Sequence, residues 1–229
     1  MIKAVDLKKS FNNPPLEILH GLNFQINDGS FVSVTGRSGS GKSTLLYCIS
    51  TLDAPTSGQV FFDGQELGEM SSEDLHEFRN QKMGFIFQFH YLLPELNSLE
   101  NVLMPARKTG RHLEKTERAK ELLKIVGLEQ KLDRLPRELS GGEQQRVAIA
   151  RSLIMNPKYL FADEPTGNLD SANGELVMEI LKSITRDGKT SVIYVTHDPD
   201  FAAMADHSIQ LADGRIILDE IRGQTTPPR

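Results

Sequence analysis

The sequence predicts an α/β protein built on a parallel sheet, and three features of the pattern support this class. Residues 30–35 form a short apolar stretch that runs into a glycine-rich loop, and a helical pattern follows the loop. Strand patterns at residues 159–162 and 191–195 flank a helical pattern at residues 174–185, the βαβ order typical of parallel sheets. Between residues 92 and 155 helical periodicity replaces the strand signal, so we expect a helical insertion in the α/β core.

Further strand signals lie on both sides of the glycine-rich loop. Residues 3–9 and 16–26 mix β-branched and apolar residues around the turn sequence Asn12-Asn13-Pro14-Pro15, and residues 59–63 read as another strand. These short strands predict a small N-terminal sheet. A helix is expected at residues 71–80, because a serine opens it and acidic residues occupy its first turn.

The predicted insertion and the C-terminal region each carry a clear local signal. Residues 114–126 have apolar side chains at helical spacing, and Asn97 followed by Glu100 predicts a capped helix start before them. A final hairpin is expected around the turn Asp213-Gly214, and residues 221–229 are expected to form a flexible tail. The folded part of the chain is therefore expected to end near residue 220.

Composition narrows the classes of function. The 229 residues carry 26 Lys and Arg against 31 Asp and Glu, a net charge of −5, so no nucleic-acid partner is expected. The single cysteine, Cys48, excludes an internal disulfide and a cysteine-based zinc cluster. No stretch approaches the roughly 18 apolar residues of a membrane span, and no signal-peptide pattern opens the chain. We therefore expect a soluble chain, which leaves a membrane partner open.

Residues 36–43 match the phosphate-binding loop pattern G-x-x-x-x-G-K-[ST]. Glycines allow backbone N–H groups to converge on phosphate oxygens, and the start of the following helix adds a favourable dipole. Lys42 is expected to reach the β- and γ-phosphates, and the Ser43 hydroxyl is expected to bind Mg²⁺. A chance match occurs in roughly one chain of this length in a hundred, so the position between strand and helix decides in favour of the loop. The candidate nucleotide-binding residues here are Gly36, Arg37, Ser38, Gly39, Ser40, Gly41, Lys42, Ser43 and Thr44.

Two adjacent carboxylates follow the apolar strand pattern that begins at Tyr159. Asp163 suits a metal ligand, and Glu164 suits a group that orients or deprotonates an attacking water. The alternative is a buried strand that merely enters an acidic turn. The phosphate-binding loop upstream favours the interpretation as a nucleoside triphosphatase.

The segment Leu139–Arg146, with the sequence LSGGEQQR, resembles the signature motif of the ATP-binding cassette family. Other motifs then follow the order of that family. Gln88 resembles the glutamine loop, Asn168-Leu169-Asp170 resembles the D-loop, and His197 resembles the switch histidine. Phe11 stands where the family has an aromatic residue that stacks on adenine, more often a tyrosine. Taken singly, each has an ordinary explanation as a surface or capping residue, but their joint order favours the family.

This resemblance spans essentially residues 2–220 and implies a fold, an activity and a site. It implies one nucleotide-binding domain at residues 1–220, with the RecA-like α/β core of P-loop NTPases, an antiparallel β subdomain and an α-helical subdomain inserted at about residues 89–155. It implies binding of ATP and Mg²⁺ and hydrolysis of ATP by a homodimer, in which signature residues complete the site of the opposite subunit. The implied catalytic residues are Lys42, Gln88, Glu164 and His197; the metal ligands are Ser43, Gln88 and Asp163; the further nucleotide contacts are Phe11, Ser140, Gly141, Gly142 and Glu143.

Within the family, residues 87–96, 99–102 and 163–170 are together similar to the ATPases of lipoprotein-releasing systems. Macrolide-exporter and antimicrobial-peptide-exporter ATPases share similar strings and remain alternatives, and importer ATPases and non-transport cassettes are less favoured. A P-loop kinase or GTPase would not need the signature segment, and no guanine-reading Asn-Lys-x-Asp string occurs in the sequence.

The resemblance also implies a partner and a location. The chain would be a peripheral protein on the cytoplasmic face of the inner membrane, where it powers integral-membrane permease subunits that dock near Phe89–Leu99. An exposed groove is expected there for a helix of the partner, and ordinary packing within the helical subdomain is the alternative. The residues expected in this groove are Phe89, Tyr91, Leu92 and Leu93.

Overall fold

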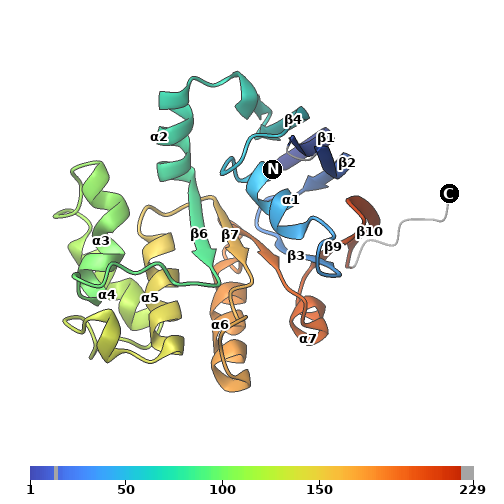
Figure 1. Ribbon diagram of the computed structural model, residues 1–229. Coiled ribbons are helices and arrows are strands. Elements are labelled where there is room, and N and C mark those ends of the chain that lie inside the picture. The colour runs from blue at the N-terminus through green and yellow to red at the C-terminus, as the bar shows by residue number, and fades with distance from the viewer. Residues whose placement is uncertain (13–14, 223–229) are drawn as a thin grey trace.

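Two sheets and a layer of helices make up the structure, a computed structural model that describes residues 1–12 and 15–222 (Figure 1). The smaller sheet contains β1 (Ile2–Asn12), β2 (Pro15–Ile26), β4 (Ser57–Phe62) and β5 (Gln65–Glu66), paired antiparallel in the order β2-β1-β4-β5. The larger sheet contains β3 (Phe31–Gly36), β6 (Met83–Phe87), β7 (Tyr159–Asp163), β8 (Ser191–Val195), β9 (His207–Ala212) and β10 (Arg215–Ile221). Its strand order is β10-β9-β3-β8-β7-β6.

The larger sheet is parallel except for its edge strand β10. β3 pairs in parallel with β8 and β9, and β7 pairs in parallel with β6 and β8, whereas β10 is antiparallel to β9. The carboxyl ends of the parallel strands therefore meet at one edge of the sheet, where ligand sites form in open α/β sheets. The loops that follow Gly36, Phe87, Asp163 and Val195 all leave from this edge.

Side chains of the larger sheet alternate between two separate apolar cores. Tyr159 and Phe161 of β7 belong to the core that the smaller sheet and the first two helices cover, whereas Leu160 and Ala162 belong to the core beneath the later helices. The same alternation places Asp163 on the side of Tyr159 and Phe161. The helices are α1 (Lys42–Ile49), α2 (Ser72–Lys82), α3 (Ser98–Lys108), α4 (Thr116–Ile125), α5 (Gly141–Leu153), α6 (Ser171–Ile184) and α7 (Pro199–Ala203).

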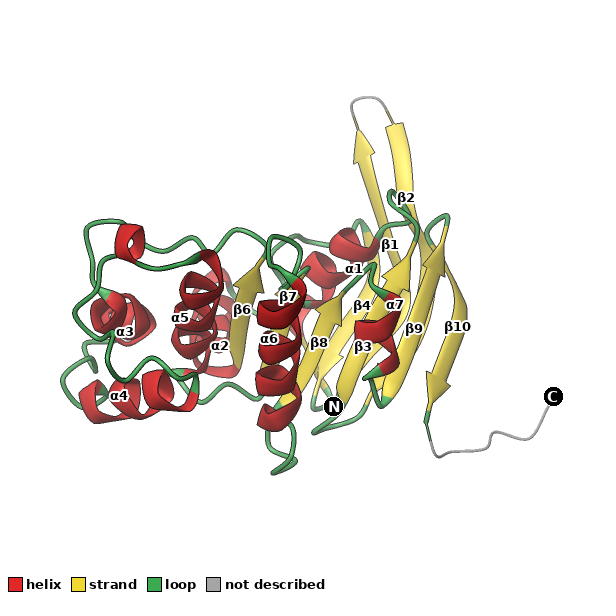
Figure 2. Cartoon of the chain, turned by 90° about the horizontal axis from the view of Figure 1, so that it is seen from below, coloured by secondary structure: helices red, strands yellow, loops and turns green. Residues whose placement is uncertain are grey.

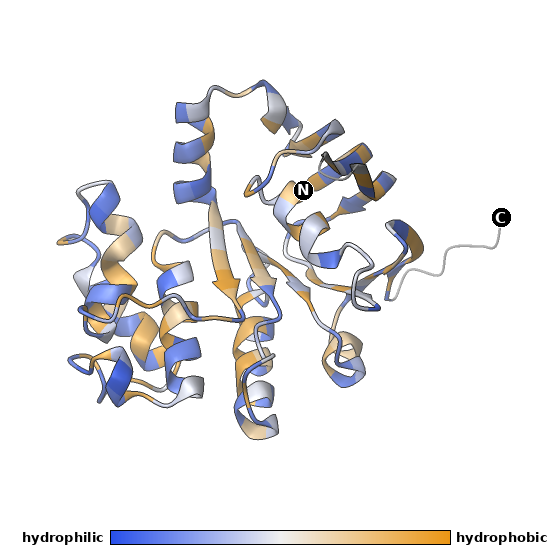
Figure 3. Ribbon diagram, viewed as in Figure 1, coloured by the Kyte–Doolittle hydropathy of each residue, from blue (hydrophilic) through white to orange (hydrophobic). Residues whose placement is uncertain are grey.

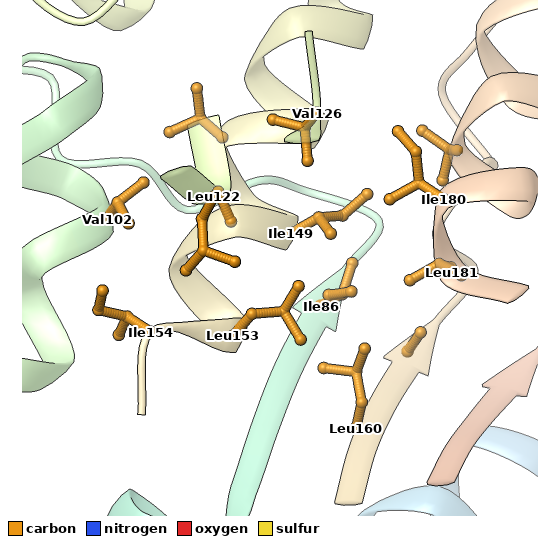
Figure 4. Close-up of a cluster of buried hydrophobic side chains, with 14 of the residues drawn as sticks. Ile86, Val102, Leu122, Val126, Ile149, Leu153, Ile154, Leu160, Ile180 and Leu181 are labelled. Atoms are coloured by element: carbon orange, nitrogen blue, oxygen red, sulfur yellow. The ribbon is translucent and has the colours of Figure 1, made fainter. Parts of the chain in front are cut away.

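The helical subdomain, α3 to α5, joins the rest of the molecule through one of these cores (Figure 4). Val102 of α3, Leu122 of α4 and Leu153 of α5 lie in the same buried cluster as Ile86 of β6 and Leu181 of α6. Burying each such aliphatic side chain contributes about 1.5–3 kcal/mol, so this cluster holds the helices against the sheet. Figure 3 shows β6 as largely hydrophobic, whereas successive turns of α6 alternate in hydropathy.

The architecture confirms the predicted α/β class, the N-terminal antiparallel sheet and the helical insertion, with shifts at element ends. The helix expected from residue 174 begins at Ser171, because the Asp170 side chain caps it by accepting from the Asn173 N–H. Strand β10 continues to Ile221, and the Arg222 N–H donates to the carbonyl of Asp206 at 2.8 Å, beyond the expected end of the fold at residue 220. The rest of the expected tail, residues 223–229, and the turn residues 13–14 lie outside the described residues.

Candidate functional site

The loop between β3 and α1 depends on glycine at two positions. Gly36 has a φ of +143°, and a Cβ there would lie 2.3 Å from the carbonyl oxygen of Leu211, so a side chain would prevent the close approach of β9. Gly41 has a φ of +97°, a conformation that other residues rarely adopt, and it directly precedes Lys42 at the start of α1. The loop therefore turns sharply and presents the unpaired N–H groups of the first turn of α1, as anion sites require.

Two polar side chains of this loop are buried in a way that suits an anion. Lys42 is buried, and its Nζ donates to the carbonyl oxygen of Arg37 at 3.0 Å. The Ser40 hydroxyl is buried as well, and it has no hydrogen-bond partner among the described residues. A buried polar group without a partner costs about 1–3 kcal/mol, and a phosphate oxygen would satisfy it. The chemistry of the loop therefore fits the phosphates of ATP.

Asp163 receives two hydrogen bonds from α1, one on each carboxylate oxygen. Ser43 Oγ donates to Asp163 Oδ1 at 2.9 Å, and the Tyr47 hydroxyl donates to Asp163 Oδ2 at 2.7 Å. Burial, and then the nearby Asp163 carboxylate, raise the pKa of Tyr47 well above its usual range. A hydroxyl and a carboxylate held together are the oxygen ligands that Mg²⁺ prefers, so Ser43 and Asp163 fit that ion.

Glu164 and His197 lie next to each other at the ends of β7 and β8. The Glu164 N–H donates to the carbonyl oxygen of Val195 at 3.2 Å, and Glu164 Oε2 lies 3.6 Å from Nδ1 of His197. Glu164 has a φ of +47°, a costly conformation for a residue other than glycine, and such strain clusters at functional sites. The imidazole of His197 is 69% exposed, so it can contact a ligand outside the sheet edge.

Gln88 follows β6 at the same sheet edge, but its hydrogen bonds are to Asn168. Its Nε2 donates to Asn168 Oδ1 at 3.3 Å, and Asn168 Nδ2 donates back to the carbonyl oxygen of Gln88 at 3.1 Å. No hydrogen bond among the described residues joins Gln88 to Ser43 or Asp163. The structure therefore connects the predicted glutamine loop to the predicted D-loop.

The signature segment forms the start of α5. Ser140 Oγ accepts from the Glu143 N–H at 3.3 Å, and the Glu143 carboxylate accepts from the Ser140 N–H at 2.8 Å, a reciprocal capping box. The hydrogen bond from the Ser140 N–H lowers the pKa of Glu143, although burial opposes this. Ser140 and Gly141 are exposed, whereas the Glu143 carboxylate is engaged in this cap and lies 3.5 Å from Lys131 Nζ.

The signature segment does not meet the loop around Lys42 in this chain. β6 and β7 lie between α5 and α1 in both views (Figures 1 and 2). Instead, α5 contacts α6 through Asn173, whose Oδ1 accepts from Arg146 Nη1 at 3.2 Å and whose Nδ2 donates to Asp170 Oδ2 at 2.8 Å. The predicted site residues thus form two separate groups.

Phe11 lies near the end of β1, and the hairpin of β1 and β2 projects past the other strands in Figure 2. Its ring is 47% exposed, and Lys9 Nζ lies 5.0 Å from the ring centroid. Lys9 is fixed by a salt bridge to Asp53 at 2.6 Å. The ring is therefore accessible for stacking on a planar ligand, with a cation already on it.

Three of the four residues expected in a groove for a membrane partner are exposed. Phe89 and Tyr91 are 64% and 65% exposed, and Leu93 is 39% exposed. Leu92 packs partly buried against the apolar core of the helical subdomain, so its expected place in an exposed groove is wrong. For Leu92 the alternative, ordinary packing within the helical subdomain, is correct, because the side chain packs against the cluster under α3 and α5.

The sequence patterns missed three residues that organise these groups. Tyr47 lies four residues after Ser43 on the same helix face, so helical spacing alone could have placed it near Asp163. Asn173 connects α5 with Asp170. Gln145, fully buried, donates from Nε2 to the Pro165 carbonyl at 2.6 Å. A buried amide in the middle of a helix gives no signal of its partners in the sequence.

The fold and the site together define a class, the P-loop nucleoside triphosphatases of the cassette type. Residues 19–167 match the family model described as ABC transporter. The chain therefore belongs to the ABC transporter family, as the motif resemblance predicted, and it is an ATPase subunit of that family. None of its helices within residues 1–12 and 15–222 has the length and apolar character needed to cross a bilayer.

Close relatives carry one common name. The chain is 54% identical to the lipoprotein-releasing system ATP-binding protein LolD of Leptospira interrogans, over 94% of this chain and 90% of that protein. It is 50% identical to the protein of the same name from Aquifex aeolicus, over 95% of this chain and 96% of that protein. Among solved structures, the dimeric ABC transporter cassette MJ0796 matches with a TM-score of 0.89 and 40% identity, over 98% of this chain and 100% of that chain. The post-hydrolysis dimer of MJ0796 bound to ADP and Pi matches with a TM-score of 0.87 and 37% identity, at the same coverage.

Proposed function

We propose that this protein binds MgATP at the loop between β3 and α1 and hydrolyses ATP there as a homodimer, to power a separate membrane permease. Lys42 neutralises charge on the β- and γ-phosphates, and Ser43 with Asp163 holds Mg²⁺, which offsets further phosphate charge. Glu164 orients or deprotonates the attacking water, and His197 contacts the γ-phosphate. The single observation that carries this proposal is the pairing of Ser43 with Asp163 beside the buried ammonium of Lys42.

Gln88 is proposed to sense the metal and the γ-phosphate at this site. Its amide would exchange its hydrogen bond with Asn168 for one toward the bound ion and its waters. Because Gln88 directly precedes the exposed Phe89, such an exchange would move the segment proposed below to contact the membrane partner.

The dimer is proposed because the nucleotide loop and the signature segment form separate groups in one chain. Ser140 and Gly141 are exposed at the start of α5, on the other side of β6 and β7 from Lys42. A second copy of the chain can bring its own signature residues to the exposed side of the nucleotide. The relative MJ0796, described as a dimeric cassette, supports this arrangement.

Mixed dimers test the shared site. Lys42→Ala removes the ammonium of one loop, and Ser140→Arg places a bulky side chain where the other copy's nucleotide would lie. In a mixed dimer both defects fall on the same shared site, so we expect one tightly bound ATP per differently tagged heterodimer. The homodimer of Ser72→Arg, at an exposed serine that starts α2, is the matched control for the arginine substitution and should bind two ATP molecules. Full hydrolysis by monomers of Ser140→Arg would refute the proposal.

The transported cargo is proposed to be lipoproteins released from the inner membrane toward the outer membrane, with this chain acting at the cytoplasmic face. Support comes from relatives at 46–54% identity that are named lipoprotein-releasing system ATP-binding proteins. The ATPase of a macrolide or antimicrobial-peptide exporter is the alternative. Co-purification of the chain with its permease and identification of that permease separates the two, because the permease binds the cargo.

The docking segment, residues 89–99, is proposed to contact the permease. Arg151 of α5 donates from Nη2 to the carbonyl oxygen of His90 at 2.7 Å and from Nη1 to that of Tyr91 at 2.6 Å. Burial lowers the pKa of this guanidinium. Tyr91 has a φ of +46°, so the two hydrogen bonds hold a strained backbone that keeps Phe89 and Tyr91 exposed. Two exposed aromatic rings on a fixed backbone suit contact with an amphipathic helix.

A cleft beside the docking segment fits the same partner. It has a volume of about 380 Å³ and is lined by apolar residues such as Phe87 and Met155 and by the basic residues Arg79, Lys108 and Arg151. This lining suits a partner helix that carries apolar and acidic side chains.

Substitution of the exposed rings tests this contact. Phe89→Asp should abolish co-purification with the permease while ATP hydrolysis by the isolated chain persists, because the ring is largely exposed. Leu113→Asp is the matched control, since Leu113 is 79% exposed elsewhere in the helical subdomain. Unchanged permease binding by Phe89→Asp, or an equal loss in Leu113→Asp, would contradict the proposed contact.

A further inference from the structure

The Tyr47 hydroxyl is a second donor to the carboxylate of Asp163, opposite the one from Ser43. It donates to Oδ2 at 2.7 Å, while Ser43 donates to Oδ1 at 2.9 Å. Both donors lie on α1, and both carboxylate oxygens are therefore held by one helix. A carboxylate bound through both oxygens cannot rotate about its Cβ–Cγ bond without breaking a hydrogen bond.

The local fold explains why these three side chains meet. Residues four apart on a helix lie on the same face, so Ser43 and Tyr47 point together toward β7. Asp163 ends β7 on the side of Tyr159 and Phe161, which is the side that α1 covers. Tyr47 is half-buried against that core, so its ring has a fixed position from which the hydroxyl reaches Oδ2.

With both hydrogen bonds in place, the Asp163 carboxylate can still bind a cation. An ionised carboxylate offers about four lone pairs, and the two hydrogen bonds use only two of them. Ser43 can donate its proton to Asp163 and still offer an oxygen lone pair to a metal ion. Groups that orient metal-binding carboxylates in this way are typical of metal sites, and their removal weakens metal binding by about 10–100-fold.

We propose that Tyr47 is a positioning residue for the Mg²⁺ that accompanies ATP, and that it acts by fixing the Asp163 carboxylate between two donors of α1. This inference rests on the proposed nucleotide site, because it takes Ser43 and Asp163 as the groups that hold the ion. Tyr47 itself does not touch the ion or the nucleotide.

The alternative is that the Tyr47 hydroxyl only helps α1 to pack on the sheet. The chain contains a matched comparison for that role at the other end of the same strand. Tyr159 begins β7, and its hydroxyl donates to Asp63 Oδ1 at 3.0 Å. Tyr159→Phe therefore removes the same kind of tyrosine-to-aspartate hydrogen bond, far from the proposed metal.

The test measures how strongly Mg²⁺ tightens nucleotide binding, a readout that does not depend on turnover. The dissociation constant of a non-hydrolysable ATP analogue is measured by calorimetry in EDTA and again in excess Mg²⁺, for the full chain and for each variant. The dissociation constant in EDTA divided by the dissociation constant in Mg²⁺ reports the coupling between metal and nucleotide. Tyr47→Phe, which keeps the buried ring, should lower this ratio about tenfold, while affinity in EDTA stays close to that of the unmodified protein. Tyr159→Phe should leave the ratio unchanged.

Two further variants separate failure of this inference from failure of the proposed site. Ser43→Ala and Asp163→Asn alter the groups taken to hold the ion, so both should lower the ratio. If they do and Tyr47→Phe does not, Tyr47 has only a packing role and the inference is overturned. If neither lowers the ratio, the proposed metal site itself is wrong. A drop in melting temperature of Tyr47→Phe with an unchanged ratio also counts against the inference.

Discussion

Gly142, the second residue of α5, offers a test of how the signature segment is held. A Cβ at Gly142 would lie 2.4 Å from Asn173 Oδ1 and 3.1 Å from Asn173 Cβ. Both distances are shorter than ordinary contacts, so in Gly142→Ala the Asn173 side chain has to move. Its movement would break the hydrogen bonds that connect it to Arg146 and Asp170.

The magnitude follows from these two hydrogen bonds. Each involves a charged partner, and such bonds contribute about 1.5 kcal/mol at the lower end of their range, so their loss costs about 3 kcal/mol. Replacing glycine by alanine in a helix stabilises the folded protein by about 1 kcal/mol, which offsets part of this cost. Part of the loss is recovered by water because Asp170 is exposed, so the expected net destabilisation of Gly142→Ala is about 1–2 kcal/mol.

Urea unfolding of the protein without nucleotide measures this difference, and Gly141→Ala is the matched control. Apart from its chain neighbours and the backbone of its own helix, no atom of the described residues lies within 4 Å of a Cβ built at Gly141, so that variant should be stabilised by about 0.5 kcal/mol. With a denaturant slope of about 3 kcal/mol per molar, the two unfolding midpoints should differ by roughly 0.5–0.8 M. Equal stabilisation by both alanines would refute the reasoning, because it would show that Asn173 moves without losing any interaction.

Three other substitutions give distinct results. Glu164→Gln should retain ATP binding but lower turnover at least 100-fold, and trap an ATP-bound dimer visible by size exclusion; turnover near the unmodified rate would exclude Glu164 as the water-orienting group. Lys42→Ala should weaken ATP binding at least tenfold in calorimetry, because it removes a charge-assisted contact to phosphate; an unchanged affinity would count against the loop. Burial would raise the pKa of Asp63, but hydrogen bonds from Lys158, the α-amino group and Tyr159 lower it from 3.8 to about 2. The ionised Asp63 carboxylate therefore stabilises the folded protein above about pH 4, and this stabilisation is lost as the pH falls through 2. Because the side chain is half-exposed, Asp63→Asn should lower the free energy of unfolding by about 1 kcal/mol at pH 7 and by little at pH 2, as measured by thermal unfolding. Equal losses at both pH values would contradict the assignment.

The sequence was sufficient for those parts of the site that follow strand ends. Gly36, Asp163 and His197 each come after an apolar strand pattern, and parallel pairing necessarily brings such ends to one edge. A local pattern also predicted the helix start at Asn97, since a capping box needs only residues three apart.

Contacts between distant segments were not predictable in this way. The hydrogen bond from Gln88 to Asn168 joins residues 80 positions apart, and nothing in either local pattern specifies which partner an amide selects. The orientation of Leu92 depends on how α3 and α5 pack, so an apolar residue beside two exposed aromatic residues reads in the sequence as part of the same surface. Tyr47 is the intermediate case, because its position on the helix was predictable but the distance to Asp163 required the register of β7.

The pairing of β7 on both sides has a consequence for motion. Its backbone is hydrogen-bonded to β6 and to β8 in parallel register, so Asp163 cannot shift relative to Phe87 or Val195 without breaking the sheet. No strand pairing connects α3, α4 and α5 to that sheet, and side-chain packing and loops hold them. Side-chain interfaces can slide by small amounts at low cost, whereas strand ladders cannot. Opening and closing around a nucleotide would therefore rotate the three helices as a unit, with the strand edge as the fixed frame.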